Sequence, residues 1–115
     1  MNIQEFATEI YEKLGCGYNE CVYHNAFEVL LRKNGIQYET ERIVPIHFEG
    51  HIIGNLRSDL IIGQEVVVEL KAARVITDVM RAQLRNYLNL TGLSKGFLIN
   101  FPLVGDKIQV EIILK

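Results

Sequence analysis

The sequence predicts an α/β domain in which helices flank a mixed β-sheet. Apolar residues recur at helical spacing before residue 34, alternate with a period of two from Ile36 to Phe48, and form two short apolar runs around Gly63. The second of these runs begins a strand–helix–strand segment. Such a segment is a right-handed crossover, so its two strands should be parallel within a sheet that also contains hairpins. With 115 residues, 49% of them hydrophobic, the chain is long enough to form a single domain over residues 1–115.

Two helices are expected at the start of the chain. The first should run from Asn2 to Leu14, where apolar residues fall at three- and four-residue steps, before a glycine-containing turn. The second should run from Glu20 to Lys33 and stop at Asn34-Gly35. Its apolar residues occupy two adjoining faces, which predicts a largely buried helix. Glu20 aligns with the apolar side, although an acid at a helix start is also favoured by the helix dipole alone.

The next segments alternate with a period of two. Ile36 to Thr40 and Val44 to Phe48 read as strands, and Pro45 predicts an edge strand or a bulge. Glu49-Gly50 is a candidate two-residue hairpin turn. The histidines that flank it, His47 and His51, have no third ligand nearby, so they are expected on the hairpin surface and not in a zinc site.

Two strands, Arg57 to Ile62 and Val66 to Lys71, are joined around Gly63 and carry the charges of greatest interest. Glu69 and Lys71 fall on one side of a buried strand, where charges are costly unless they are paired or hold a metal. A two-residue loop would place Asp59 opposite Val68. A loop with an odd number of residues, or a bulge, would instead place Asp59 opposite Glu69. We predict the odd register.

A third helix should begin after Thr77, a good N-cap, and stop at Gly92. Gln83 and Tyr87 lie one turn apart on it and could project together towards the sheet. Two further strands, Gly96 to Phe101 and Ile108 to Leu114, complete the chain.

Composition limits the functions open to the chain. Its net charge of −2 argues against tight non-specific binding of nucleic acid. The N-terminus lacks a signal peptide and no apolar run reaches the length of a membrane span, so we expect a cytoplasmic protein with no membrane partner. Cys16 and Cys21 match no metal or redox spacing and are expected to be free thiols.

The candidate site combines three carboxylates and an amine, Glu20, Asp59, Glu69 and Lys71. Such a set suits Mg²⁺, which binds one or two carboxylates and keeps several waters. Lys71 beside the cation could orient or help deprotonate the attacking water and offset charge on a phosphate.

Three motifs, which include these residues together with Gln83 and Tyr87, resemble one protein family. Asp59 followed by Glu69-x-Lys71 resembles the PD-(D/E)XK nuclease superfamily. The spacing Gly17-x-x-Glu20-x-x-Tyr23 is similar to the motif that names its GxxExxY group. Gln83-x-x-x-Tyr87 resembles the QxxxY motif of its RecB-like and lambda-exonuclease-like nucleases. Ser58 stands where the superfamily name has Pro, which is a backbone feature and not a ligand.

The resemblance implies a restriction-endonuclease-like αβββαβ core and metal-dependent hydrolysis of nucleic-acid phosphodiester bonds, with DNA as the expected substrate. Mg²⁺ or Mn²⁺ would be held by Glu20, Asp59, Glu69 and the Leu70 carbonyl. Lys71, Gln83 and Glu20 would have catalytic roles, supported by Tyr87 and Tyr23. The nearby candidates for phosphate binding are Arg57, Arg74, Arg81 and Arg85.

Two other interpretations remain open. The chain could be a weak or inactive subunit with a nuclease fold that binds or regulates together with a partner. Its length, which is little more than the core of the fold requires, and its negative charge favour this interpretation. A homodimer or a partner protein could then supply basic surface. The charges could also be purely structural, with Glu69, Lys71, Asp59 and Arg57 as charged strand ends.

Overall fold

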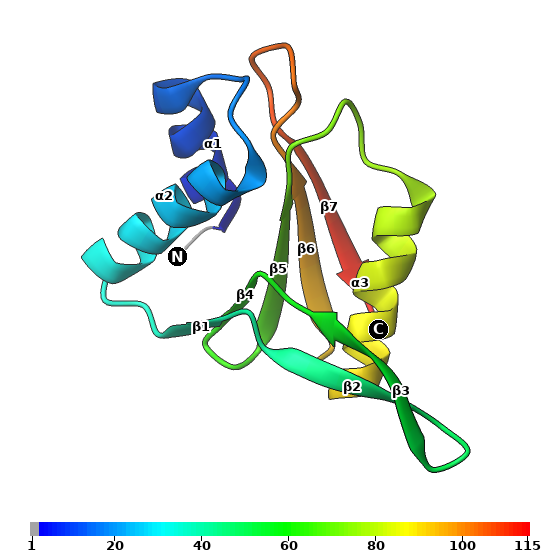
Figure 1. The fold of residues 1–115 in the computed structure, drawn as a ribbon. Coiled ribbons are helices and arrows are strands. Elements are labelled where there is room, and N and C mark those ends of the chain that lie inside the picture. The colour runs from blue at the N-terminus through cyan, green and yellow to red at the C-terminus, as the bar shows by residue number, and fades with distance from the viewer. Residues whose placement is uncertain (1–2) are drawn as a thin grey trace.

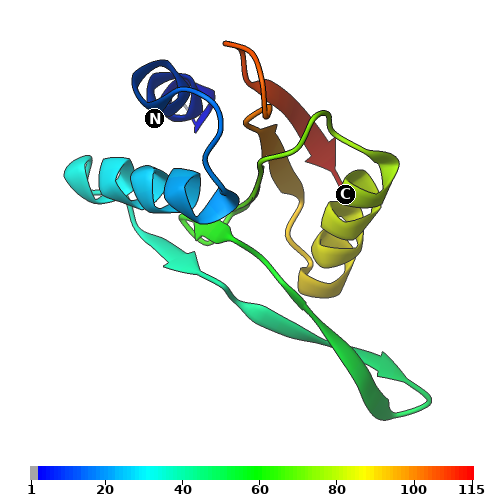
Figure 2. The ribbon, with the colours of Figure 1, turned by 45° about the horizontal axis from the view of Figure 1, so that its top comes forward.

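The computed structural model describes residues 3–115, which form helices on both faces of a mixed sheet (Figures 1 and 2). The helices are α1 (Ile3–Leu14), α2 (Glu20–Lys33) and α3 (Asp78–Thr91). The strands are β1 (Tyr38–Thr40), β2 (Ile43–Phe48), β3 (His51–Arg57), β4 (Leu60–Ile62), β5 (Val66–Lys71), β6 (Lys95–Asn100) and β7 (Gln109–Leu114). The predicted bounds of the second helix are confirmed, whereas the expected start of the first at Asn2 lies outside the described residues.

The main sheet has the order β1-β4-β5-β6-β7. Strands β5 and β6 are parallel, and the other pairs are antiparallel. This confirms the predicted mixed sheet, with α3 as the crossover that makes β5 and β6 parallel. Within residues 3–115, no helix is long and apolar enough to cross a membrane.

Strand β5 is buried between two hydrophobic layers. Val68 and Leu70 pack in the cluster that contains α1 and α2, whereas Val67 packs in the cluster that contains α3. Alternating residues of this strand therefore face opposite helical layers, as its continuous apolar run requires. Glu69 and Lys71 share the parity of Val67 and so belong to the face that α3 covers.

Strands β2 and β3 form a separate two-stranded arm that projects beyond the main sheet (Figure 2). Its turn is Glu49-Gly50, and both residues have positive φ, 51° and 78°, as a two-residue hairpin of this hand requires. A register shift between Ile46 and His47, directly after Pro45, confirms the expected bulge. His47 is exposed, as predicted for the hairpin surface.

The predicted strand from Arg57 to Ile62 is wrong in one respect, because it is broken at Ser58. The Ser58 N–H donates to the Arg42 carbonyl oxygen at 3.2 Å, on the arm side of the break. One residue further, the Asp59 carbonyl oxygen accepts from the Glu41 N–H at 3.1 Å, on the sheet side. The chain turns from arm to sheet here, and Glu41 adopts a left-handed φ of 54° to allow it.

The expectation that α2 is largely buried is also wrong. Its buried side chains, Tyr23, Phe27 and Leu31, form one stripe that faces the core. Val29 lies on another face and is 47% exposed. The sheet covers only one side of the helix, so the second apolar face predicted from the sequence remains partly in solvent.

Packing between α3 and β6 leaves no room for a side chain at Gly96. A Cβ atom there would lie 2.9 Å from Cδ1 of the buried Leu84. We therefore expect Gly96→Ala to lower the free energy of unfolding by about 1–3 kcal/mol, measured by urea denaturation. Gly54→Ala is the matched control, because its Cβ would lie 3.7 Å from the nearest atom, Ile46 Cδ1. Equal stability of the two variants would contradict this account of the interface.

Candidate metal and catalytic site

The register of β4 against β5 brings the two central acids together. Leu60 pairs with Val68, and Ile62 pairs with Val66, across a three-residue loop. Counting one pair further along the ladder places Asp59 opposite Glu69. The predicted odd register is confirmed.

Two backbone amides fix these carboxylates. The Leu70 N–H donates to Asp59 Oδ2 at 2.7 Å, and the Asp59 N–H donates to Glu69 Oε1 at 3.2 Å. Each carboxylate is thus bound by the strand that carries the other. The side chains are only partly exposed, so this arrangement holds two acids close together in a poorly solvated position.

The proximity of the two acids changes the protonation of one of them. Burial and the negative charge of Asp59 raise the pKa of Glu69 from its ordinary value of 4.5 to about 8, although the nearby Lys71 ammonium acts in the opposite direction. Glu69 therefore carries a proton at neutral pH in the cation-free protein. A divalent cation would offset the same repulsion.

The residues present fit a hard cation that needs few protein ligands. Among residues 3–115, no three side chains of His, Cys, Asp or Glu are grouped closely enough to hold a metal ion. Asp59 and Glu69 alone match Mg²⁺, which binds through one or two carboxylates and keeps several waters. The site as folded therefore offers a two-carboxylate centre, with Glu20 standing apart from it.

Glu20 and Asp59 line one cleft of about 370 Å³ between α2 and the start of the arm. The remaining lining residues are Cys21, His24, Asn25, Glu28, Thr40, Glu41, Arg57 and Leu70. Glu20 is the first residue of α2 and is exposed, so its carboxylate is accessible from the cleft. The structure thus places Glu20, Arg57, Asp59 and Leu70 around a common space.

The buried Tyr23 contacts the loop that precedes α2. Its hydroxyl donates to the Gly15 carbonyl oxygen at 2.8 Å and accepts from the Tyr18 N–H at 3.4 Å. Its ring stacks on Phe101 with centroids 4.2 Å apart and an angle of 5° between the planes. These contacts hold the loop that precedes Glu20 against the end of β6.

Gln83 and Tyr87 lie on α3, across the sheet from α2. Tyr87 is buried, and its hydroxyl donates to the Arg42 carbonyl oxygen at 3.2 Å, at the base of the arm. Gln83 is exposed and does not line the cleft that contains Asp59. The two residues are one turn apart, as predicted, but they face different surroundings.

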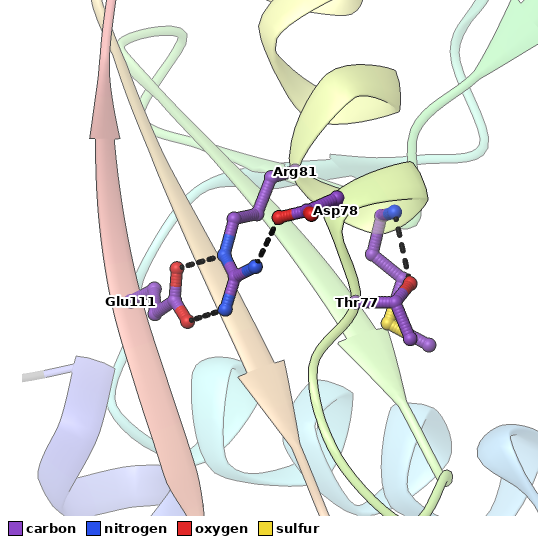
Figure 3. Close-up of polar contacts among 5 residues, drawn as sticks. Thr77, Asp78, Arg81 and Glu111 are labelled. Carbon is purple, nitrogen blue, oxygen red and sulfur yellow. Dashed lines mark hydrogen bonds and ion pairs between the residues drawn. The ribbon is translucent and has the colours of Figure 1, made fainter.

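The four arginines predicted to bind phosphate differ in how accessible their charges are. Arg57 lines the cleft, and Arg74 and Arg85 are exposed. Arg81 instead makes a bidentate pair with Glu111, both contacts 2.7 Å, and a third contact of 2.7 Å with Asp78 (Figure 3). A phosphate at Arg81 would compete with two carboxylates that already satisfy it.

Sequence reasoning missed two kinds of site residue. His24 and Glu28 line the cleft, and their only sequence signal was the four-residue spacing from Glu20. Asn100 is buried at the end of β6, where its amide binds both the N–H and the carbonyl of Ala73 at 2.9 Å. Asn100 therefore fixes the loop that follows Lys71, and a polar residue ending an apolar strand could have indicated it.

A mixed sheet between helices, with an Asp opposite a Glu-x-Lys strand end, defines a nuclease-like α/β fold. The model of the PD-(D/E)XK nuclease superfamily matches residues 1–112, and the chain belongs to that superfamily. The chain is also similar to the crystal structure of a protein named SSO0001, with 27% identity and a TM-score of 0.63. The match covers 83% of this chain and 49% of that one, so the chain spans about half the length of SSO0001. No curated protein matches significantly.

The raised pKa of Glu69 makes stability depend on pH. Between pH 4.5 and about 8 the folded protein holds a proton that the unfolded chain releases. The free energy of unfolding should therefore fall as the pH rises through this range, by up to about 1.4 kcal/mol per pH unit. Below pH 4.5 this contribution is fully present.

Urea unfolding of the wild type and of Glu69→Gln at pH 5, 6.5 and 8 measures this effect. A glutamine side chain at this position has no proton to lose, so the variant should lack this part of the pH dependence. Parallel pH profiles for the two proteins would show that the carboxyl of Glu69 titrates normally.

Proposed function

We propose that this chain is a metal-dependent nuclease of the GxxExxY group that hydrolyses phosphodiester bonds in nucleic acid, with DNA as the expected substrate, and that residues 1–115 act as one domain. The single observation that supports this most is the Asp59–Glu69 pair, held by hydrogen bonds from two backbone amides, with the Lys71 ammonium close enough to act on the pKa of Glu69. A fold that keeps two acids and an amine together at adjoining strand ends tolerates repulsion that a cation would relieve.

Asp59, Glu69 and the Leu70 carbonyl would hold Mg²⁺ or Mn²⁺, with Glu20 as a further carboxylate across the cleft. The cation would polarise the phosphoryl oxygen and lower the pKa of a bound water. Glu69 would have to lose its proton before its carboxylate could bind the cation. Lys71, on the same strand side as Glu69, would orient the water and offset charge on the phosphate.

The remaining predicted residues would act around this centre. Gln83 would position the water, the cation or the substrate phosphate, and Tyr87 would support it from α3. Arg57, Arg74 and Arg85 are the arginines with charge available to a phosphate backbone, since Arg81 is engaged by Glu111 and Asp78. Tyr23 would support Glu20 through the loop before α2.

A second candidate function is that of a binding or regulatory subunit with little activity of its own. The described residues lack a three-ligand metal group, and the net charge is −2; both observations favour this alternative. In that case a homodimer or a partner protein would supply the basic surface that nucleic acid requires.

Cleavage of single-stranded, duplex and branched DNA with Mg²⁺ or Mn²⁺ tests the proposal. We expect Asp59→Asn and Lys71→Ala each to lower the rate by at least about 100-fold, because each removes a group that acts at the reacting phosphate. Glu65→Gln is the matched control, since Glu65 lies in the exposed loop between β4 and β5 and should keep full activity.

Isothermal titration of Mn²⁺ into the wild type and Asp59→Asn separates the two candidate functions. Metal binding that Asp59→Asn abolishes, together with cleavage, supports the nuclease. Binding of nucleic acid without metal-dependent cleavage of any substrate supports the regulatory subunit and excludes the first proposal.

A further inference from the structure

The side of the cleft formed by α2 carries an imidazole that the proposed chemistry does not use. His24 lies one turn after Glu20, and its side chain is 16% exposed where it lines the cleft. The opposite side includes the end of strand β1 and Glu41, which follows it. The strand begins at Tyr38, which contacts Glu28, and the Glu41 N–H donates to the Asp59 carbonyl oxygen. His24, Glu28 and Asp59 therefore line the same cleft.

The imidazole contacts Glu28, and two further side chains hold Glu28 in place. His24 Nε2 lies 2.9 Å from Glu28 Oε2. The other Glu28 oxygen accepts from the Tyr38 hydroxyl at 2.9 Å and from Arg32 Nη1 at 3.4 Å. Arg32 also donates to the Tyr38 hydroxyl oxygen at 2.9 Å. Glu28 is thus fixed from both α2 and β1, which goes beyond an ordinary surface pair on one helix.

The contact with Glu28 determines which ring nitrogen of His24 carries the proton and which is left to bind another group. An ionised carboxylate can only accept hydrogen bonds, so Nε2 carries the proton that points to Glu28. In the neutral ring, Nδ1 is then an acceptor, and the contacts within residues 3–115 leave it without a partner. A fixed carboxylate behind an imidazole is a common means of orienting the second nitrogen towards a ligand.

The charge of the cleft indicates what that ligand offers. Four carboxylates line the cleft, those of Glu20, Glu28, Glu41 and Asp59, against the single guanidinium of Arg57. A run of phosphates would meet net repulsion there unless a cation intervened. The hydrogen-bonding side chains of His24, Asn25 and Thr40 also line the cleft, and such groups instead suit the base of a nucleotide.

We propose that His24 is a substrate-binding residue whose Nδ1 accepts a hydrogen bond from an N–H group of the base in the nucleotide beside the scissile phosphate, with Glu28 as its positioning residue. This inference rests on the proposed nuclease function. It assigns the α2 side of the cleft to the nucleotide and the Asp59 side to the phosphate.

Two substitutions distinguish substrate binding from a structural role. In His24→Gln the amide lies near the position of Nε2, so the contact with Glu28 survives while the Nδ1 acceptor is lost. In His24→Asn the amide lies near the position of Nδ1, so the reverse applies. His51→Gln, at the exposed tip of the arm, is the matched control.

The readouts are the dissociation constant for a fluorescent single-stranded oligodeoxynucleotide with Ca²⁺ in place of Mg²⁺, the KM and kcat for cleavage, and the urea midpoint. We expect His24→Gln to weaken binding and raise KM by about five- to tenfold, the loss of one hydrogen bond, with kcat and stability unchanged. His24→Asn should recover part of the affinity while lowering the urea midpoint. An oligonucleotide of the same sequence with one abasic site tests whether the base is the donor, because it lacks the base but keeps the sugar and the phosphates.

Each outcome decides the proposal. Wild-type affinity in His24→Gln, with a lowered midpoint only in His24→Asn, would show that His24 serves stability alone and would overturn it, as would a wild type that binds no oligonucleotide. Because affinity is measured without cleavage, weaker binding by His24→Gln would support the His24 assignment even if wild type and Asp59→Asn both fail to cleave. Failure of both the wild type and Asp59→Asn to cleave would instead remove the proposed nuclease function.

Discussion

Two backbone amides, those of Leu70 and Asp59, hold the carboxylates of the site by binding each acid to the strand that carries the other. The geometry of the acids and the register of β4 against β5 are therefore one constraint. A slip by one residue would move Asp59 to the opposite face. It would also exchange Leu60 and Ile62 with Ile61 between the two hydrophobic layers, so packing on both faces of β4 favours the register that joins the two acids.

This constraint extends to the arm and to α3. Asp59 directly follows Ser58, where backbone pairing passes from arm to sheet. The Arg42 carbonyl oxygen at that point accepts both the Ser58 N–H and the Tyr87 hydroxyl. Helix α3 thus contacts the backbone next to the site and also covers the face of the sheet to which Glu69 and Lys71 belong. The buried Tyr87 therefore holds the backbone at the point where the arm meets the sheet, one residue before Asp59.

Local patterns predicted most of the fold, because caps and turns depend on a few neighbouring residues. Thr77 caps α3 through the Met80 N–H, and Gly92 ends it with a φ of 79°. The register around Gly63 was predictable because only a loop with an odd number of residues, or a bulge, brings Asp59 and Glu69 to one face. Pairing between distant segments was not: the break at Ser58 and the engagement of Arg81 by Glu111 depend on chain direction and on partners far along the sequence. Val29 is exposed because few elements of the fold cover α2, which also depends on the arrangement of distant segments.

The separation of the acids along the chain has a consequence for the order of folding. Asp59 and Glu69 are ten residues apart and belong to one short hairpin, so a small loop closure is enough to join them. Loops of this length close within about 10–100 ns. Glu20 reaches the same cleft only when α2 docks on the sheet, which is a much longer-range event. The two-acid centre can therefore assemble early and locally, and the cleft around it is completed only by the late docking of α2.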